Sequence, residues 1–227
     1  MTTRASLSHH LDLYRYWQAK RGSGVPTRRD LDPTDIPRLL PHLALIQAVG
    51  GGYRWRVMGS QIVDDMGCDL TNQPFGGHVR PLWFVGAMTA TFDRVLGEGQ
   101  PVFEGSVYTT ADDRTHAVSR LLLPLAASSG TPPMVLLTRI TRRRPLDRPA
   151  NYIRAASGTI TGTCDVGSPE ELERRVTLWE SGTVPPVASI APQPVRRIAN
   201  LWDGGLPQIV WCGAARKTRP VPSAVPR

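Results

Sequence analysis

The sequence contains little lysine, little cysteine and no long uninterrupted apolar run. Lys20 and Lys217 are the only lysines among 27 basic residues, so the formal net charge of +8 comes almost entirely from arginine. Arginine suits phosphate and carboxylate recognition, and the composition therefore permits an anionic partner without identifying one. No apolar stretch approaches the roughly 20 residues of a transmembrane helix, which predicts a protein without a membrane partner.

The three cysteines are scattered along the chain as Cys68, Cys164 and Cys212. They include no close pair of the kind that a zinc site or a redox motif requires. His9 and His10 precede any apolar run, so the N-terminal sequence shows no secretory h-region. We therefore expect a reduced protein located in the cytoplasm.

Motifs that carry catalysis are also absent. The sequence has no Gly-x-Ser-x-Gly elbow and no phosphate-binding glycine loop followed by lysine and serine or threonine. Gly97 and Gly99 follow a predicted helix, where glycine acts as a C-cap. His42, His78 and His116 lack the regular spacing of a metal-ligand set. These absences predict a protein that is not an enzyme, and they leave its cofactor unknown.

Hydrophobic periodicity nevertheless defines an ordered region. It predicts the following elements: helices at 9–21, 33–40, 60–66 and 82–96, and strands at 43–49, 53–58, 102–108, 117–123 and 135–140. The last three strands are joined by short turns, which exclude parallel crossovers. The order predicts an α+β fold with a five-stranded antiparallel sheet, helices on one face and an N-terminal helical arm.

The composition changes after residue 145. Residues 146–227 contain ten prolines, which predicts a mostly irregular, low-order C-terminal tail. Ser168 and Glu171 have the spacing of a capping box and start one short amphipathic helix near 169–180. The predicted organisation is a flexible N-terminus at 1–8, a domain at 9–145 and this tail. The tail contains Trp179, Trp202 and Trp211. These tryptophans either bind a partner or pack on the domain, or the tail is an extension under little selection.

Several sequence clusters resemble a known family. They are Leu13 to Trp17, Asp32-Pro33, Leu39 to His42, Tyr53 to Gly59, and Gly67 to Thr71. Over about residues 9–141 the chain resembles the small single-PAS proteins of alphaproteobacteria, the type-five PAS family. This resemblance implies a PAS-like sensory or regulatory domain of a bacterial signalling protein. It implies no particular ligand.

The resemblance also indicates where a ligand would bind. Arg56 and Arg120 match arginines that recur in the family, and an anionic ligand would balance them if both were buried. The alternatives are internal pairing with Asp30, Asp32 or Asp65, or exposure on the open face of the sheet. Strand alternation places Arg56 beside Arg54 and opposite Trp55, which favours exposure.

Bulky apolar residues of the predicted sheet and long helix occupy the region in which PAS proteins commonly hold a ligand. The predicted ligand-binding residues are Trp55, Arg56, Trp83, Met88, Phe92 and Arg120. The simpler interpretation of the apolar members is an ordinary core. None of the three spaced histidines lies on the long helix, where a haem-binding PAS domain would carry its ligand, and the flavin photoreceptor pattern is absent.

The favoured function is non-catalytic sensing or regulation through a small-molecule ligand or a protein partner, with a homodimer left open. The alternative is a nucleic-acid-associated protein that acts through its basic tail. Residues 146–227 carry ten basic and seven acidic residues. That balance is a weak electrostatic field for following phosphates, so the sensory interpretation is preferred.

Overall fold

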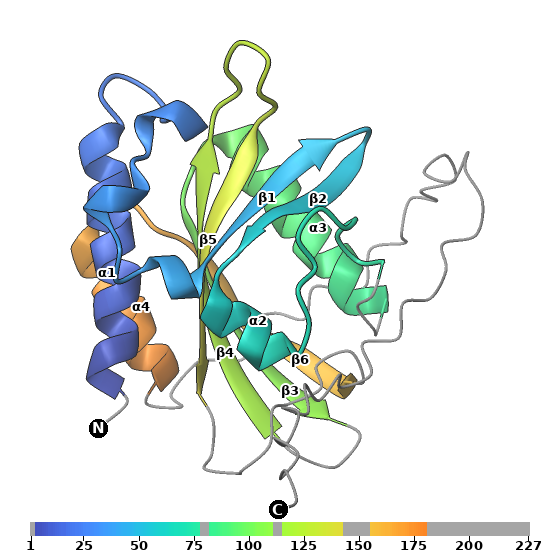
Figure 1. The fold of residues 1–227 in the computed structure, drawn as a ribbon. Helices are drawn as coiled ribbons and strands as arrows, with labels where there is room; N and C mark the ends of the chain where they lie inside the picture. The colour runs from blue at the N-terminus through green and yellow to red at the C-terminus, as the bar shows by residue number, and fades with distance from the viewer. Residues whose placement is uncertain (1–2, 78–81, 111–114, 143–154, 181–227) are drawn as a thin grey trace, which may run out of the picture.

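An antiparallel six-stranded sheet forms the centre of the computed structural model, which describes residues 3–77, 82–110, 115–142 and 155–180 (Figure 1). Its strand order is β2-β1-β5-β4-β3-β6. The strands are β1 (Leu43–Val49), β2 (Gly52–Met58), β3 (Val102–Thr110), β4 (Thr115–Leu125), β5 (Met134–Arg142) and β6 (Ala155–Asp165).

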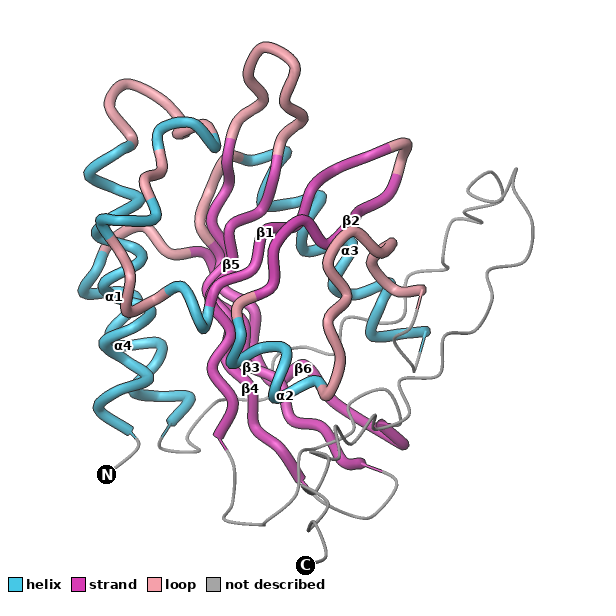
Figure 2. The backbone as a smooth tube through the Cα atoms, in the orientation of Figure 1, coloured by secondary structure: helices cyan, strands magenta, loops and turns pink. Residues whose placement is uncertain are grey.

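Helices cover both faces of this sheet (Figure 2). The longer helices are α1 (Thr3–Lys20), α2 (Ser60–Met66), α3 (Leu82–Glu98) and α4 (Pro169–Glu180). The 3-10 turns are η1 (Arg28–Asp30), η2 (Pro33–Asp35) and η3 (Leu40–His42). Helices α1 and α4 lie on one face, and α2 and α3 lie on the other. The predicted α+β fold with an antiparallel sheet is therefore confirmed.

Four details of the prediction are wrong. The sheet has six strands instead of five, and its helices lie on both faces instead of one. Helix α1 begins at Thr3, six residues before the predicted start at residue 9. The predicted helix at 33–40 is replaced by two 3-10 turns, although Asp32 does cap the first of them through Thr34.

Part of the predicted low-order tail belongs to the sheet. Strand β6 pairs with β3 along its length, although its glycine-containing sequence carries only a weak strand pattern. Helix α4 lies where the capping box predicted it, with Ser168 Oγ accepting a hydrogen bond from the Glu171 amide at 3.2 Å. We therefore propose that the folding unit extends to Glu180, instead of ending near residue 145.

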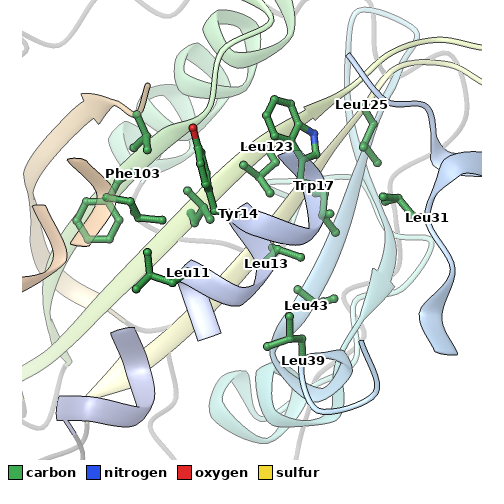
Figure 3. Close-up of a cluster of buried hydrophobic side chains, with 14 of the residues drawn as sticks. Leu11, Leu13, Tyr14, Trp17, Leu31, Leu39, Leu43, Phe103, Leu123 and Leu125 are labelled. Atoms are coloured by element: carbon green, nitrogen blue, oxygen red, sulfur yellow. The ribbon is translucent and has the colours of Figure 1, made fainter. Parts of the chain in front are cut away.

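The α1/α4 face of the sheet has its own apolar core (Figure 3). Leu13 and Trp17 of α1 are fully buried against β4 and β5. The indole Nε1 of Trp17 donates a hydrogen bond to the Pro124 carbonyl at 2.8 Å. Leu172 and Val176 of α4 complete this core. The extension thus covers apolar surface that the PAS-like region alone would leave exposed.

Close packing of α4 depends on one glycine. A Cβ at Gly105 of β3 would overlap the indole of Trp179, which is 91% buried at the end of α4. Trp179 also packs edge to face on Phe103, with 6.5 Å between the ring centroids. The absence of a side chain at Gly105 therefore lets the tryptophan approach the strand.

We expect Gly105→Ala to displace α4 and to lower the free energy of unfolding by about 1 to 3 kcal/mol, as overpacking does. Chemical denaturation and limited proteolysis within residues 166–180 measure the two effects. The matched control is Gly97→Ala in α3, where nothing lies within 4 Å of the new methyl group. Equal stability and equal proteolysis of the two variants would contradict the role of Gly105.

A buried histidine anchors α1 to the sheet. His10 is fully buried, and its ring nitrogens lie 2.6 Å from Thr138 Oγ1 and 2.9 Å from Ser119 Oγ. Burial, with smaller contributions from the nearby His9 and His42, lowers the pKa of His10 from 6.5 to about 3. The imidazole is therefore neutral in the folded protein at neutral pH.

The lowered pKa predicts acid sensitivity. The unfolded chain binds a proton at His10 below pH 6.5, whereas the folded chain binds it only near pH 3. The contribution is therefore complete above pH 6.5 and is lost as pH falls, by up to about 1.4 kcal/mol per pH unit. His10→Gln should show a shallower loss than the wild type in denaturation series between pH 7 and 4. Parallel curves for the two proteins would contradict the prediction.

Candidate functional site

The α2/α3 face of the sheet holds the second apolar core, and three predicted ligand-binding residues meet in it. Trp55, Met88 and Phe92 are each at least 96% buried. Phe75 joins β2 to α3, because its ring centroid lies 5.4 Å from that of Trp55 and 4.9 Å from that of Phe92. Strand alternation on β2 and the helical period of α3 bring these side chains together.

One polar atom in this core has no protein partner. The indole Nε1 of Trp55 is buried and makes no hydrogen bond, although its backbone pairs with the loop at Asn72 and Gln73. The Trp17 indole on the other face does have an acceptor. Buried donors are nearly always satisfied, so an orphaned one marks a position where a water or a ligand atom is expected.

A buried ion pair lies at the other end of the same face. Arg120 of β4 stands opposite Glu104 of β3, and their side chains are 7% and 0% exposed. Nη1 of Arg120 lies 2.9 Å from Oε2 and 3.1 Å from Oε1 of Glu104, and it also donates to Ser106 Oγ at 2.9 Å. Phe84 of α3 lies over the guanidinium, 5.5 Å from ring centroid to Cζ.

A second buried ion pair lies beside the first. Arg139 of β5 is the register partner of Arg120, so the two guanidinium groups occupy adjacent positions on neighbouring strands. Nη1 of Arg139 donates to Oδ2 of Asp65 on α2 at 3.3 Å, and both side chains are 5% exposed. Gln61 Nε2, one turn earlier on α2, donates to Oδ1 of Asp65 at 3.1 Å.

We use the name charged row for Glu104, Arg120, Arg139 and Asp65. The next position on the same face, two residues along the strands, holds Ala44, Leu137 and Leu122. Trp55 is level with the position two residues beyond that, so it lies four residues along the strands from the charged row. At about 3.3 Å per residue, the charged row and the Trp55 position are ~13 Å apart along the strands. The face between sheet and helices is therefore apolar at one end and charged at the other.

Two hydroxyl groups near the charged row also lack partners. Thr163 of β6 stands opposite Glu104, and Thr141 follows Arg139 by two residues on β5. Their Oγ1 atoms are buried without a hydrogen bond, as is Trp55 Nε1. Three unsatisfied polar atoms thus lie on the α2/α3 face.

The other three predicted ligand-binding residues, Arg120, Arg56 and Trp83, do not share one location. Arg120 is buried on the α2/α3 face, but its partner is Glu104, which sequence reasoning did not consider. Arg56 is exposed and donates to Asn72 Oδ1 at 2.8 Å, so it does not join the group. Trp83 lies in α3, and its side chain falls outside the described part of the protein.

Sequence reasoning missed Glu104 and Arg139. Arg139 interrupts an apolar strand, and Glu104 shares the face of Val102, so both were visible as charged residues at inward positions. The register of the β3–β4 and β4–β5 pairs shows that they lie beside Arg120. A carboxylate at a core position opposite an arginine was the available signal.

Among residues 3–77, 82–110, 115–142 and 155–180, no group of three or more histidine, cysteine or acidic side chains is placed to hold a metal ion. No helix in those ranges is long and apolar enough to cross a bilayer.

The first five strands are arranged in the order 2-1-5-4-3, with α2 and α3 inserted between the second and third strands on one face. This arrangement, with a partly polar core under those helices, defines a PAS-type domain. A family model described as a PAS domain, the type-five PAS family, matches residues 5–138, and the chain belongs to this family. A search of curated proteins finds none that matches. Membership associates the chain with sensing or regulation in general.

Proposed function

We propose that this protein is a non-catalytic sensor whose PAS domain binds a small molecule between the sheet and helices α2 and α3. Binding would shift the domain between two conformations, one of which a partner protein recognises. The observation that carries the proposal is the buried, unsatisfied indole Nε1 of Trp55 on that face. A ligand atom accepting this hydrogen bond would remove an energetic penalty that the ligand-free fold carries.

Helix α2 is the element best suited to move. It has only seven residues and lies between Gly59 and Gly67, with no side chain capping its N-terminus. Gly67 has a φ of 74°, which ends the helix in the left-handed region. Ile62 and Met66 hold α2 on the core, and Asp65 holds it on Arg139. A ligand that alters these contacts would therefore change the position of α2 before that of the sheet.

Native mass spectrometry of freshly purified full-length protein tests the proposal. We expect a mass increment from a bound small molecule that is reduced in Trp55→Phe, because phenylalanine keeps an aromatic ring but cannot donate the hydrogen bond. Trp17→Phe, on the opposite face, is the matched control and should retain the increment. A wild-type spectrum without any increment, together with unchanged tryptophan fluorescence across a small-molecule library, would contradict the proposal.

The second candidate, nucleic-acid binding, depends on the formal net charge of +8. Titration of labelled DNA and RNA with the full chain and with a chain ending at Glu180 compares the two functions. A sensor should show weak binding by both proteins at physiological salt. Tight binding that disappears with added salt and with residues 181–227 would favour the nucleic-acid function, because phosphate contacts release counterions.

A further inference from the structure

We propose that the ligand is a small organic carboxylate whose anionic group replaces Asp65 on Arg139. This inference rests on the proposed sensory function and names the chemistry of its ligand. In the ligand-free fold, Asp65 would act as an internal substitute for that carboxylate. Helix α2 carries Asp65, so exchange of the two carboxylates would remove one of the contacts that hold α2 on the sheet.

The two carboxylates of the charged row are carried by different kinds of element. Glu104 belongs to β3, which is paired on both sides by β4 and β6, and both of its oxygens lie within 3.1 Å of Arg120 Nη1. Asp65 belongs to a short helix, and its Oδ2 lies 3.3 Å from Arg139 Nη1. Charge-assisted contacts of this kind are usually about 2.7 to 2.9 Å long. Asp65 is therefore on the element that can move relative to the sheet, and it is the carboxylate that we expect a ligand to replace.

Charge balance favours a monoanion. The charged row contains two arginines and two carboxylates. Exchange of Asp65 for a ligand carboxylate leaves the buried charge unchanged, whereas a phosphate dianion would add a negative charge and a neutral ligand would leave Arg139 without that carboxylate. The guanidinium group also binds a carboxylate through two parallel hydrogen bonds, a geometry that a mobile ligand adopts more readily than a side chain fixed to α2.

The apolar side chains on the rest of the α2/α3 face favour a ligand whose carboxylate is attached to an apolar chain. Ala44, Leu137 and Leu122 separate the charged row from Trp55, and Met88 and Phe92 of α3 cover that end. A carboxylate bound to Arg139 would extend over these apolar side chains toward the unsatisfied indole ~13 Å away along the strands. The order of charged and apolar side chains matches the chemistry of a medium-chain acid, or of an acid with a hydrogen-bond acceptor at its far end.

The probes are hexanoate, octanoate and decanoate, with 1-octanol as the neutral control. Binding to the full chain is measured by isothermal calorimetry and by tryptophan fluorescence. We expect at least one carboxylate to bind about tenfold more tightly than octanol, because a hydrogen-bonded charge is recognised only by the acid. Arg139→Gln should remove this preference. Equal binding of acid and alcohol, or no binding of any acid, would overturn the proposal.

Two variants test the displacement of Asp65. Gln61→Ala removes the amide that holds Asp65 and should raise carboxylate affinity by about three- to tenfold. Asp65→Asn should raise it further, and the thermal stability that this variant loses should be restored by octanoate but not by octanol. Asp64→Asn makes the same chemical change at the adjacent, exposed position of α2 and should behave as the wild type.

The result that overturns the displacement step is an unchanged or reduced carboxylate affinity in Gln61→Ala. This variant keeps the buried charges and remains informative if Asp65→Asn does not fold. Failure here is distinguishable from failure of the sensory function. If native mass spectrometry detects a Trp55-dependent neutral ligand while carboxylates do not bind, the sensor proposal stands and the carboxylate inference is wrong.

Discussion

Replacement of Glu104 by alanine is expected to lower the free energy of unfolding by about 3 to 5 kcal/mol, because it takes the paired carboxylate away from a buried guanidinium. Arg120 is 7% exposed and cannot reach solvent without leaving the core between the sheet and α3. Glu104 supplies two acceptor oxygens to it, and Ser106 supplies a third acceptor. Urea denaturation followed by circular dichroism measures the loss.

The double variant Glu104→Leu with Arg120→Met separates the ion pair from the space that it fills. Replacing both charges with apolar groups of similar size should recover most of the lost stability, since a buried pair is costly to desolvate. Glu98→Ala, which removes the exposed i, i+4 partner of Arg94, should change stability little. A double variant as unstable as Glu104→Ala would show that the charges themselves stabilise the fold.

Trp55→Ala is expected to cost about 3 to 5 kcal/mol, the range for truncation of a large core residue. The ring is 4% exposed and packs against Phe75 at the edge of the core. The same denaturation experiment measures this loss. A cost below about 1 kcal/mol would indicate that the ring contributes little to packing.

A comparison of two conservative variants isolates the indole nitrogen. Trp17→Phe removes the donor to the Pro124 carbonyl and should cost about 1 to 3 kcal/mol more than Trp55→Phe, whose indole has no acceptor to lose. The two rings are similarly buried, so their packing losses largely cancel. Equal costs for the two variants would mean that Trp55 Nε1 has an acceptor in solution, and a bound water would be the first candidate.

Local patterns in the sequence predicted most of the elements correctly. Alternation placed Trp55 inward and Arg56 outward, and the structure confirms both positions. The helical period of 82–96 correctly placed Met88 and Phe92 in the core. The capping signal at Ser168 correctly predicted the start of α4. These features depend on neighbours within a few residues, and the sequence displays such neighbours directly.

The charged row could not be derived in the same way. Arg139 and Asp65 are 74 residues apart, and their pairing depends on the position of α2 over β5. Glu104 and Arg120 meet through the register of a hairpin, and the predicted strands at 102–108 and 117–123 do not fix that register. A one-residue change in that register would move either side chain to the opposite face.

The sequence by itself determined the α+β class, the PAS-like order of elements and the inward position of Trp55, because strand alternation and helical periodicity are local properties. Only the tertiary structure decided that β6 and α4 belong to the fold, since β6 is stabilised by the free edge of β3 and α4 by the space above Gly105. It also decided which buried charges meet. Pairing across a sheet depends on register and on the docking of helices, which arise only when distant segments pack together.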